Sequence, residues 1–285
     1  MADDYSPTTL PLDLERHIFE LSAVSRPVSI PNLLRVAWRV KHWVEPLLYR
    51  TLIICKEPEN YRKVDELPWC TLEDFNQIVR RTESASFLRD SVRNVMFQHL
   101  NAGEIDSILS ACSGLHNMHA LGCEDPTAFP DSLRLRRLHC DNDDHPALKL
   151  SSRHITHLEL FIGLTLDYDL YEDDPTQWSA VTRLPHLTHL SLNFKSLLPV
   201  CLHLLDACNS LCALIILRSS PAYPVPETLA GDPRFVMMEL PQRTADWQRG
   251  ILTGDDYWAR ADAFIAKRRS GEIDRRTFFL EADRS

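Results

Sequence analysis

One short pattern, apolar-x-x-apolar-x-apolar, recurs along most of this sequence and restricts its possible folds more than any other feature. Seven copies are readable, and an eighth, centred on Leu52, is a possible earlier one. The steps between the middle apolar residues are 23, 20, 20, 32, 24 and 24 residues. Those middle residues are Val95, Met118, Leu138, Leu158, Leu190, Leu214 and Met238.

The spacing within each copy is that of a half-buried strand. The last two apolar residues are two apart, so both point to one face of the strand. One such strand cannot bury its face alone, but stacked copies form a continuous core. Five of the six steps fall within the 20–29 residues of leucine-rich repeats. The sequence therefore predicts an α/β fold with an irregular leucine-rich-repeat-like solenoid over residues 51–245, built from parallel strands and variable helices on its convex side.

Helices are predicted between some of the copies. Thr71, with Asp74 three residues later, is a start signal for a helix over Leu72–Arg81. Asn101 is suited to cap Ala102–Cys112, and Pro199 to begin the helix that continues over Val200–Cys208.

The C-terminal segment, residues 246–285, predicts a helix that caps the array. Asp255 and Asp256 lie at its start, the basic run from Lys267 to Arg269 near its end, and Gly271 just beyond. Its buried stripe is predicted to consist of Trp258, Ala261 and Ile265. Terminal repeats need such a cover because their core edge is otherwise open.

Residues 1–50 predict a separate unit of three short helices. Leu14, Ile18 and Leu21 have the spacing of one helix face. Pro27 and Pro31 interrupt the chain before a second amphipathic stretch. The stripe expected there consists of Val36, Val40, Trp43 and Leu47.

This unit resembles an F-box, through the segments LPLDLERHIFEL, LLRVAWRVKHW and PLLYR. More narrowly, together with the repeat array and the tail over residues 255–273, it is similar to the F-box-like proteins of mushroom-forming (basidiomycete) fungi. The resemblance implies that five positions pack the box or contact a Skp-type adaptor, and through it a cullin. They are Leu10, Pro11, Ile18, Val40 and Trp43.

Two functions follow from that resemblance. In the first, the chain is the substrate receptor of a Skp/cullin/F-box ubiquitin ligase and recruits a target protein. In the second, it is an interaction scaffold without a ligase role, and residues 10–50 only cap the array.

A target-binding surface is expected on the sheet positions that alternate with the core positions. We call this surface the histidine face, because four of the chain's 12 histidines lie on it. We expect it to be exposed, as the binding faces of curved solenoids are, although a merely solvated polar face has the same pattern. The candidate contact residues are Asn117, His119, Arg137, His139, His157, Glu159, His189 and Ser191.

Composition excludes several other classes. The net charge of −9 argues against binding nucleic acid through bulk positive charge. The few glycines form no phosphate-binding or nucleophile-elbow motif, so neither a nucleotide cofactor nor an enzyme is predicted. No Cys-x-x-Cys pair occurs, so no metal site is predicted, and the eight cysteines are expected to be reduced.

The distribution of charge and hydropathy adds two expectations. Residues 101–180 hold fourteen acidic and five basic side chains, many of the acidic ones in the stretches 141–144 and 167–174. The longest apolar run is Leu211–Leu217, too short to span a bilayer, and the first residues have no signal-peptide pattern. A cytoplasmic or nuclear location without membrane contact is therefore expected.

Overall fold

The computed structural model describes residues 10–56, 67, 69–81, 85–124, 133–142, 153–162, 178–193, 198–218, 224–239 and 241–281. Its central feature is one sheet with the strand order β10-β9-β8-β7-β6-β5-β4-β3-β1-β2, in which every neighbouring pair is parallel. The strands are β1 (Thr51–Cys55), β2 (Trp69–Thr71), β3 (Asn94–Gln98), β4 (Asn117–Leu121), β5 (Arg137–Asn142), β6 (His157–Ile162), β7 (His189–Leu192), β8 (Ala213–Arg218), β9 (Phe235–Glu239) and β10 (Phe279–Leu280).

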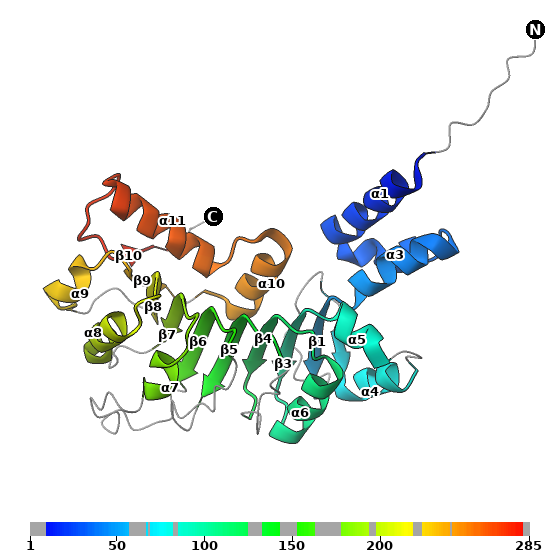
Figure 1. Cartoon of the computed structure of the whole chain (residues 1–285), viewed down its shortest axis with the longest axis horizontal. Helices are drawn as coiled ribbons and strands as arrows, with labels where there is room; N and C mark the ends of the chain where they lie inside the picture. Colours follow the sequence, from blue (N-terminus) through cyan, green and yellow to red (C-terminus); the bar gives the residue numbers. More distant parts are fainter. Residues whose placement is uncertain are drawn as a thin grey trace, which may run out of the picture.

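The helices form three groups around this sheet (Figure 1). The N-terminal group is α1 (Leu12–Ser25), the 3₁₀ turn η1 (Pro27–Ser29), α2 (Ile30–Leu33) and α3 (Trp38–Leu48). The second group is α4 (Leu72–Arg81), α5 (Ala85–Ser91), α6 (Ala102–Ala111), α7 (Ser179–Thr182), α8 (Leu198–Ala207) and α9 (Glu227–Gly231). The last group is α10 (Arg243–Thr253) and α11 (Tyr257–Ser270).

The predicted solenoid-like α/β fold with parallel strands is confirmed. Each of the seven repeat copies contains a strand, and the possible earlier copy around Leu52 is β1. Strands β2 and β10 were not predicted, since they are two or three residues long and carry no complete copy of the pattern. The acidic stretch 167–174, and residues 143 and 144 of the other, lie outside the described residues.

The local signals for helices between the strands are also confirmed. The Thr71 hydroxyl accepts a bond from the Asp74 backbone N–H at 3.1 Å, and the Asp74 carboxylate accepts one from the Thr71 N–H at 3.1 Å. Asn101 and Glu104 form the same reciprocal capping box at the start of α6. These caps satisfy N–H groups that the first helical turn leaves without partners.

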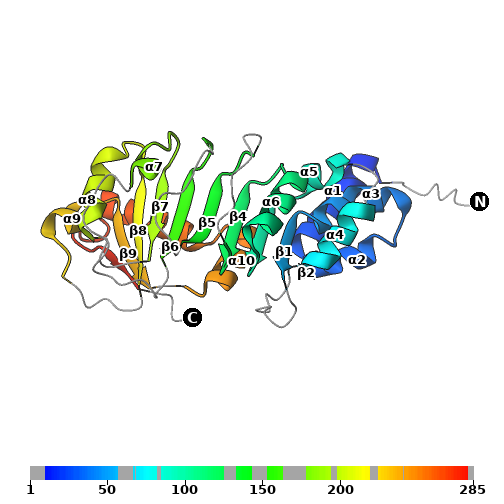
Figure 2. The same cartoon turned by 90° about the horizontal axis from the view of Figure 1, so that it is seen from below.

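The main core lies between the sheet and the second group of helices. Seen from that side, α4 to α6 cover the N-terminal end of the sheet and α7 to α9 the C-terminal end (Figure 2). Buried residues such as Phe75, Ile105, Leu138, Leu190 and Leu204 form one continuous cluster along the array. This is the stacked core that single strands cannot form alone.

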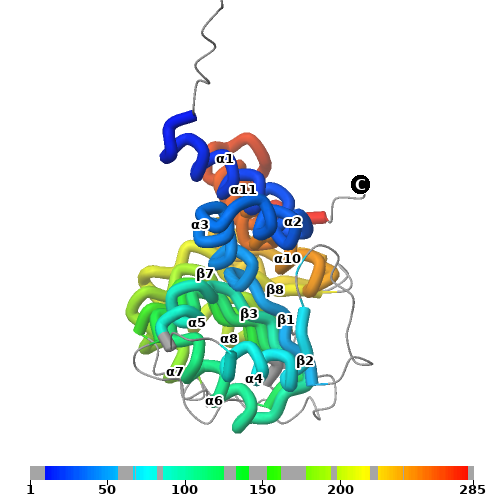
Figure 3. Tube along the Cα trace, turned by 90° about the vertical axis from the view of Figure 1, so that its right-hand side faces the viewer, coloured from blue at the N-terminus to red at the C-terminus, as the bar shows by residue number. Residues whose placement is uncertain are grey.

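The predicted C-terminal helix is present as α11, and the end of the array beyond β9 is covered by β10 from the same segment. Helices α10 and α11 run across the sheet face opposite the main core, instead of closing the open end of the array (Figures 1 and 3). Trp258, Ala261 and Ile265 are buried as predicted, but they pack with residues of β8 and β9. The predicted boundary between residues 245 and 246 falls within α10.

Arg268 fastens α11 to the last repeat. Its fully buried guanidinium donates to the backbone carbonyls of Ala230 at 2.8 Å, Phe235 at 2.6 Å and Pro233 at 3.3 Å, and also to that of Arg275. Basic side chains near a helix end are often solvated, so the sequence signal did not distinguish this buried role. The contact holds α11 at a fixed place on the sheet.

Candidate functional site

The histidine face consists of two rows of side chains that cross the sheet. Parallel strands in register place equivalent residues side by side. The first row runs Thr51, Asn94, Asn117, Arg137, His157, His189, Ala213. The second row, two residues later on each strand, runs Ile53, Met96, His119, His139, Glu159, Ser191, Ile215, Val236.

The expectation that the histidine face is exposed is wrong. Helices α10 and α11 cover it, and Glu159 is only 2% exposed and His119 only 1%. Asn117, His139, His189 and Ser191 are buried as well, whereas Arg137 and His157 are half-buried. The structure brings all eight candidate residues together, but under a cover made by the chain itself. The buried candidate residues are therefore not accessible to a target protein, and the prediction that they contact one directly is wrong.

Glu159 is the centre of a polar cluster beneath this cover. Its carboxylate accepts a bond from Arg243 Nε at 3.0 Å and one from the Tyr257 hydroxyl at 2.8 Å. Nδ1 of His139 lies 2.7 Å from the same carboxylate. Arg243 is on α10 and Tyr257 begins α11, so one buried acid joins both helices to the middle of the sheet.

Charges within the cluster change how its members bind protons. Burial alone would raise the pKa of Glu159, but the Arg243 charge and the hydrogen bond with His139 outweigh it and lower that pKa strongly. Burial, followed by the Glu159 charge, raises the pKa of Tyr257 well above its usual value. Burial, with Arg243 and His139 nearby, lowers the pKa of His119. At neutral pH the acid is therefore ionised, while Tyr257 and His119 are neutral.

The histidine rings also stack in pairs along the rows. His119 and His139 are parallel with ring centroids 5.1 Å apart, and His157 and His189 with centroids 4.1 Å apart. Trp258 on α11 meets His139, His157 and His189 edge-on at 5.3–6.2 Å. Burial, with His189 and Arg137 nearby, lowers the pKa of His157 to about 2. The rings are thus packing surfaces for the covering helices.

Further contacts tie the edges of the cover. Trp247 Nε1 on α10 donates to the Asn117 side-chain oxygen at 3.3 Å. Arg137 pairs with Asp256, the residue that caps α11. Nε2 of His189 lies 3.0 Å from the carboxylate of Asp262. Within the described residues no group of three or more His, Cys, Asp or Glu is arranged to hold a metal ion.

The N-terminal helices have the opposite character. Their own core is small, with Ala23, Ile30, Val40 and Val44 as its buried residues. Glu15 on α1 and Arg39 on α3 join the two helices through a two-pronged ion pair at the surface. Much of the apolar surface of this unit is left without cover.

Exposed apolar side chains concentrate in this unit. Among the described residues, nine of the eleven exposed large apolar side chains lie between residues 10 and 38. We call the set on and around α1 the α1 stripe; it consists of Leu10, Leu12, Leu14, Ile18, Leu21 and Val24. Single exposed apolar residues are ordinary, but a concentration of them marks an interaction surface.

The five positions implied by the F-box resemblance divide between surface and interior. Leu10, Pro11 and Ile18 are exposed, Val40 is fully buried in the small core, and Trp43 is half-buried beside it. Helix α2 is only four residues long. The predicted pairing of Leu14, Ile18 and Leu21 on one helix face is correct, but that face points to solvent.

Sequence reasoning missed Arg243, Trp247 and Tyr257, which cover and complete the buried cluster. A signal for the cover was present at the ends of the second row, where Ile53, Met96, Ile215 and Val236 are apolar. A sheet face that is exposed to water is expected to be polar along its whole width, so apolar residues at both ends of the row indicate a cover. Those positions pack against α10 and α11.

Neither the scan against models of protein families nor the search of curated proteins gives a match to this sequence. No helix in the described part of the chain is both long and apolar enough to cross a membrane.

Proposed function

We propose that this chain is a protein-interaction adaptor, and specifically a substrate receptor of a Skp/cullin/F-box type of ubiquitin ligase. The observation that carries the proposal is the α1 stripe, an unburied apolar helix face on a unit with its own small core. The resemblance of residues 10–50 to an F-box identifies the expected partner as a Skp-type adaptor.

The physical role of such a receptor is proximity. One surface holds the ligase, and another holds a target, so that the target is present at a high effective concentration. The N-terminal unit, which carries the α1 stripe, and the covered array are separate parts of the molecule, and each has its own core (Figure 1). Because α10 and α11 occupy the histidine face, the target surface in this proposal lies elsewhere on the chain.

Co-purification with a Skp-type adaptor tests the proposal. The double variant Leu14→Asp with Ile18→Asp places two carboxylates in the α1 stripe, and we expect it to lose at least about 10-fold in affinity, as the loss of an interface anchor does. Both side chains are about half exposed, so the variant is expected to fold. Val79→Asp on α4 changes another exposed apolar residue and is the matched control.

Two results would reject the ligase role. If the wild-type chain does not retain the adaptor, the F-box interpretation falls, and the interaction scaffold without a ligase role replaces it. If the adaptor binds but neither the α1 variant nor Leu10→Ala with Pro11→Ala weakens it, the binding surface is not the one proposed. Circular dichroism of each variant checks that the helices are retained.

A further inference from the structure

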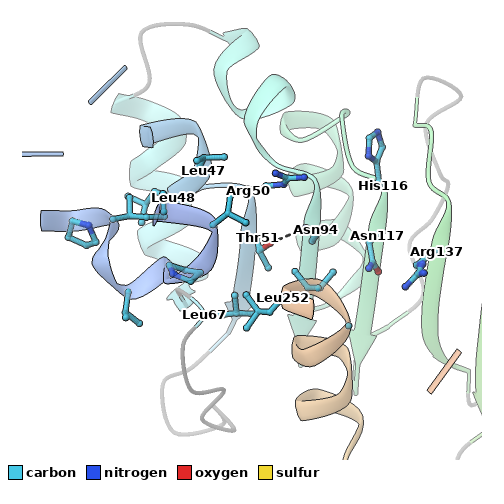
Figure 4. Close-up of a pocket in the computed structure, with 18 of the residues that line it drawn as sticks. Leu47, Leu48, Arg50, Thr51, Leu67, Asn94, His116, Asn117, Arg137 and Leu252 are labelled. Atoms are coloured by element: carbon cyan, nitrogen blue, oxygen red, sulfur yellow. Dashed lines mark hydrogen bonds between the residues drawn. The ribbon is translucent and has the colours of Figure 1, made fainter. Parts of the chain in front are cut away.

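A cleft lies where the N-terminal helices, the sheet and the end of α10 meet (Figure 4). Its volume is about 580 Å³, within the range of small-molecule pockets. Its floor is formed by Thr51, Asn94, Asn117 and Arg137, the first residues of four adjacent strands. Part of the floor is already paired, since the Asn94 amide donates to the Thr51 hydroxyl at 3.0 Å.

One wall of the cleft is apolar. It combines side chains from the N-terminal helices with others from Leu67 and the last turn of α10 (Figure 4). The prolines on this wall have no backbone N–H, so they offer no hydrogen-bond donor. The wall consists of Ala23, Val24, Pro27, Val28, Ile30, Pro31, Leu47, Leu48, Leu67, Ile251 and Leu252.

Another part of the cleft is cationic. Arg50, His116 and Arg136 each directly precede a strand, so the parallel register brings them to the same edge of the sheet. Arg137 is neutralised by Asp256, whereas Arg50 and Arg136 have no carboxylate partner among the described residues. No Asp or Glu lines the cleft within the described part of the chain, although the whole chain carries a net charge of −9.

The ionisation of His116 supports a positive potential at this edge. Partial burial lowers its pKa, and the charges of Arg93, Arg136 and Arg50 lower it further. Arg93 adds a cation held only by backbone carbonyls, including those of Arg89 at 2.8 Å and Gly114 at 3.2 Å. The cations that line the cleft itself are Arg50, Arg136 and the paired Arg137, and no described Asp or Glu lines it.

We propose that this cleft binds a small amphipathic anion: a molecule with one carboxylate head and an apolar body. The head would lie at the cationic edge that holds Arg50 and Arg136, and the body along the apolar wall. Charge-assisted bonds to arginine hold the head in place, and burial of the ligand's apolar body supplies the remaining binding free energy. An extended peptide fits less well, because it needs hydrogen-bond partners along its length and the apolar wall offers few.

The proposal goes beyond the adaptor role and does not depend on it. Decanoate is a suitable probe because it has one carboxylate and a single apolar chain. Decyltrimethylammonium has an alkyl chain of similar length with the opposite charge, and inorganic phosphate has a negative charge without any alkyl chain. Each is titrated calorimetrically into the full chain, below the concentration at which the amphiphiles form micelles.

We expect decanoate to bind at least about 10-fold more tightly than either comparison compound. Decyltrimethylammonium loses the charge-assisted bond to arginine, and inorganic phosphate loses the burial of the alkyl chain. The double variant Arg50→Gln with Arg136→Gln should weaken decanoate binding by a similar factor. Arg80→Gln, at an exposed position on α4, is the matched control and should leave it unchanged.

The apolar half of the site needs its own variant. Val28→Asp places a carboxylate on the apolar wall at an exposed position, so it should reduce decanoate affinity without unfolding the chain. Val79→Asp is its control. The proposal is overturned if decanoate does not bind, if the cationic amphiphile or phosphate binds equally well, or if the arginine and Val28 variants bind decanoate as the wild type does.

Discussion

The N-terminal helices and the histidine face place polar and apolar side chains in opposite ways. On α1, Leu14, Ile18 and Leu21 face solvent, whereas on the sheet Glu159 and His119 are buried. The polar histidine face is covered by α10 and α11 of the same chain. The apolar face has no cover among the described residues. The comparison teaches that polarity alone does not locate a binding surface, because a later segment of the same chain can occupy it.

Two tryptophans give the largest expected contrast between the regions. Trp258 is 1% exposed and contacts three histidine rings, while Trp38 on α3 is 70% exposed. Trp258→Ala should lower the free energy of unfolding by about 3–5 kcal/mol, because it opens a cavity under α11. Trp38→Ala should change it by no more than about 0.5 kcal/mol. Urea unfolding of both variants measures the difference, and equal effects would contradict the assignment of the cover.

Ion pairs provide the second contrast. Glu159→Gln removes the buried negative charge that Arg243 pairs with on the sheet, and we expect it to cost about 3 kcal/mol of stability, as breaking other buried pairs does. Glu15→Gln removes the surface pair with Arg39 and should have a much smaller effect. Chemical denaturation at pH 7.5 compares the two. A Glu159→Gln variant as stable as Glu15→Gln would show that the buried cluster does not hold the cover.

The histidines under the covering helices predict a dependence of stability on pH. The pKa values of His119 and His157 are lower in the folded chain than in the unfolded chain, where histidine has a pKa of about 6.5. The unfolded state therefore binds more protons below about pH 6.5, and stability falls there by up to about 1.4 kcal/mol per pH unit for each histidine. Above that pH the contribution is fully present.

Urea unfolding at pH 7.5 and pH 5.5 measures this loss. His119→Phe keeps a ring against His139 and Trp247 but cannot be protonated, so it should remove roughly 1 kcal/mol of the difference between the two pH values. His17→Gln changes an exposed histidine on α1 and should leave the difference as it is. A His119→Phe variant with the full acid sensitivity would show that His119 is not a source of it.

The smallest expected effect concerns the α1 stripe. Ile18→Ser should change the free energy of unfolding by no more than about 0.5 kcal/mol, because the side chain is already 54% exposed. Thermal unfolding of the free chain measures this. A loss as large as that for Trp258→Ala would mean that Ile18 is covered by part of the chain outside the described residues.

The sequence predicts local features of this fold better than long-range ones. The strands follow from a pattern six residues long, and the starts of α4 and α6 from capping residues three apart. The cover depends on contacts such as Trp247 with Asn117, which are 130 residues apart in the sequence. No local pattern reports such a contact. The sequence also left open which positions of residues 10–50 pack and which contact a partner, since a helix face of this pattern usually packs within the same domain.

The order of the elements along the chain also matters for its synthesis. The cover is made by residues 243–270, so every strand up to β9 leaves the ribosome before α10 and α11 do. During that interval the middle of the histidine face is open to water. Its asparagines, histidines and glutamate make it compatible with water, whereas an apolar face at the same place would be an aggregation site. The polar side chains that later form the buried cluster thus protect the unfinished array while its last helices are still being made.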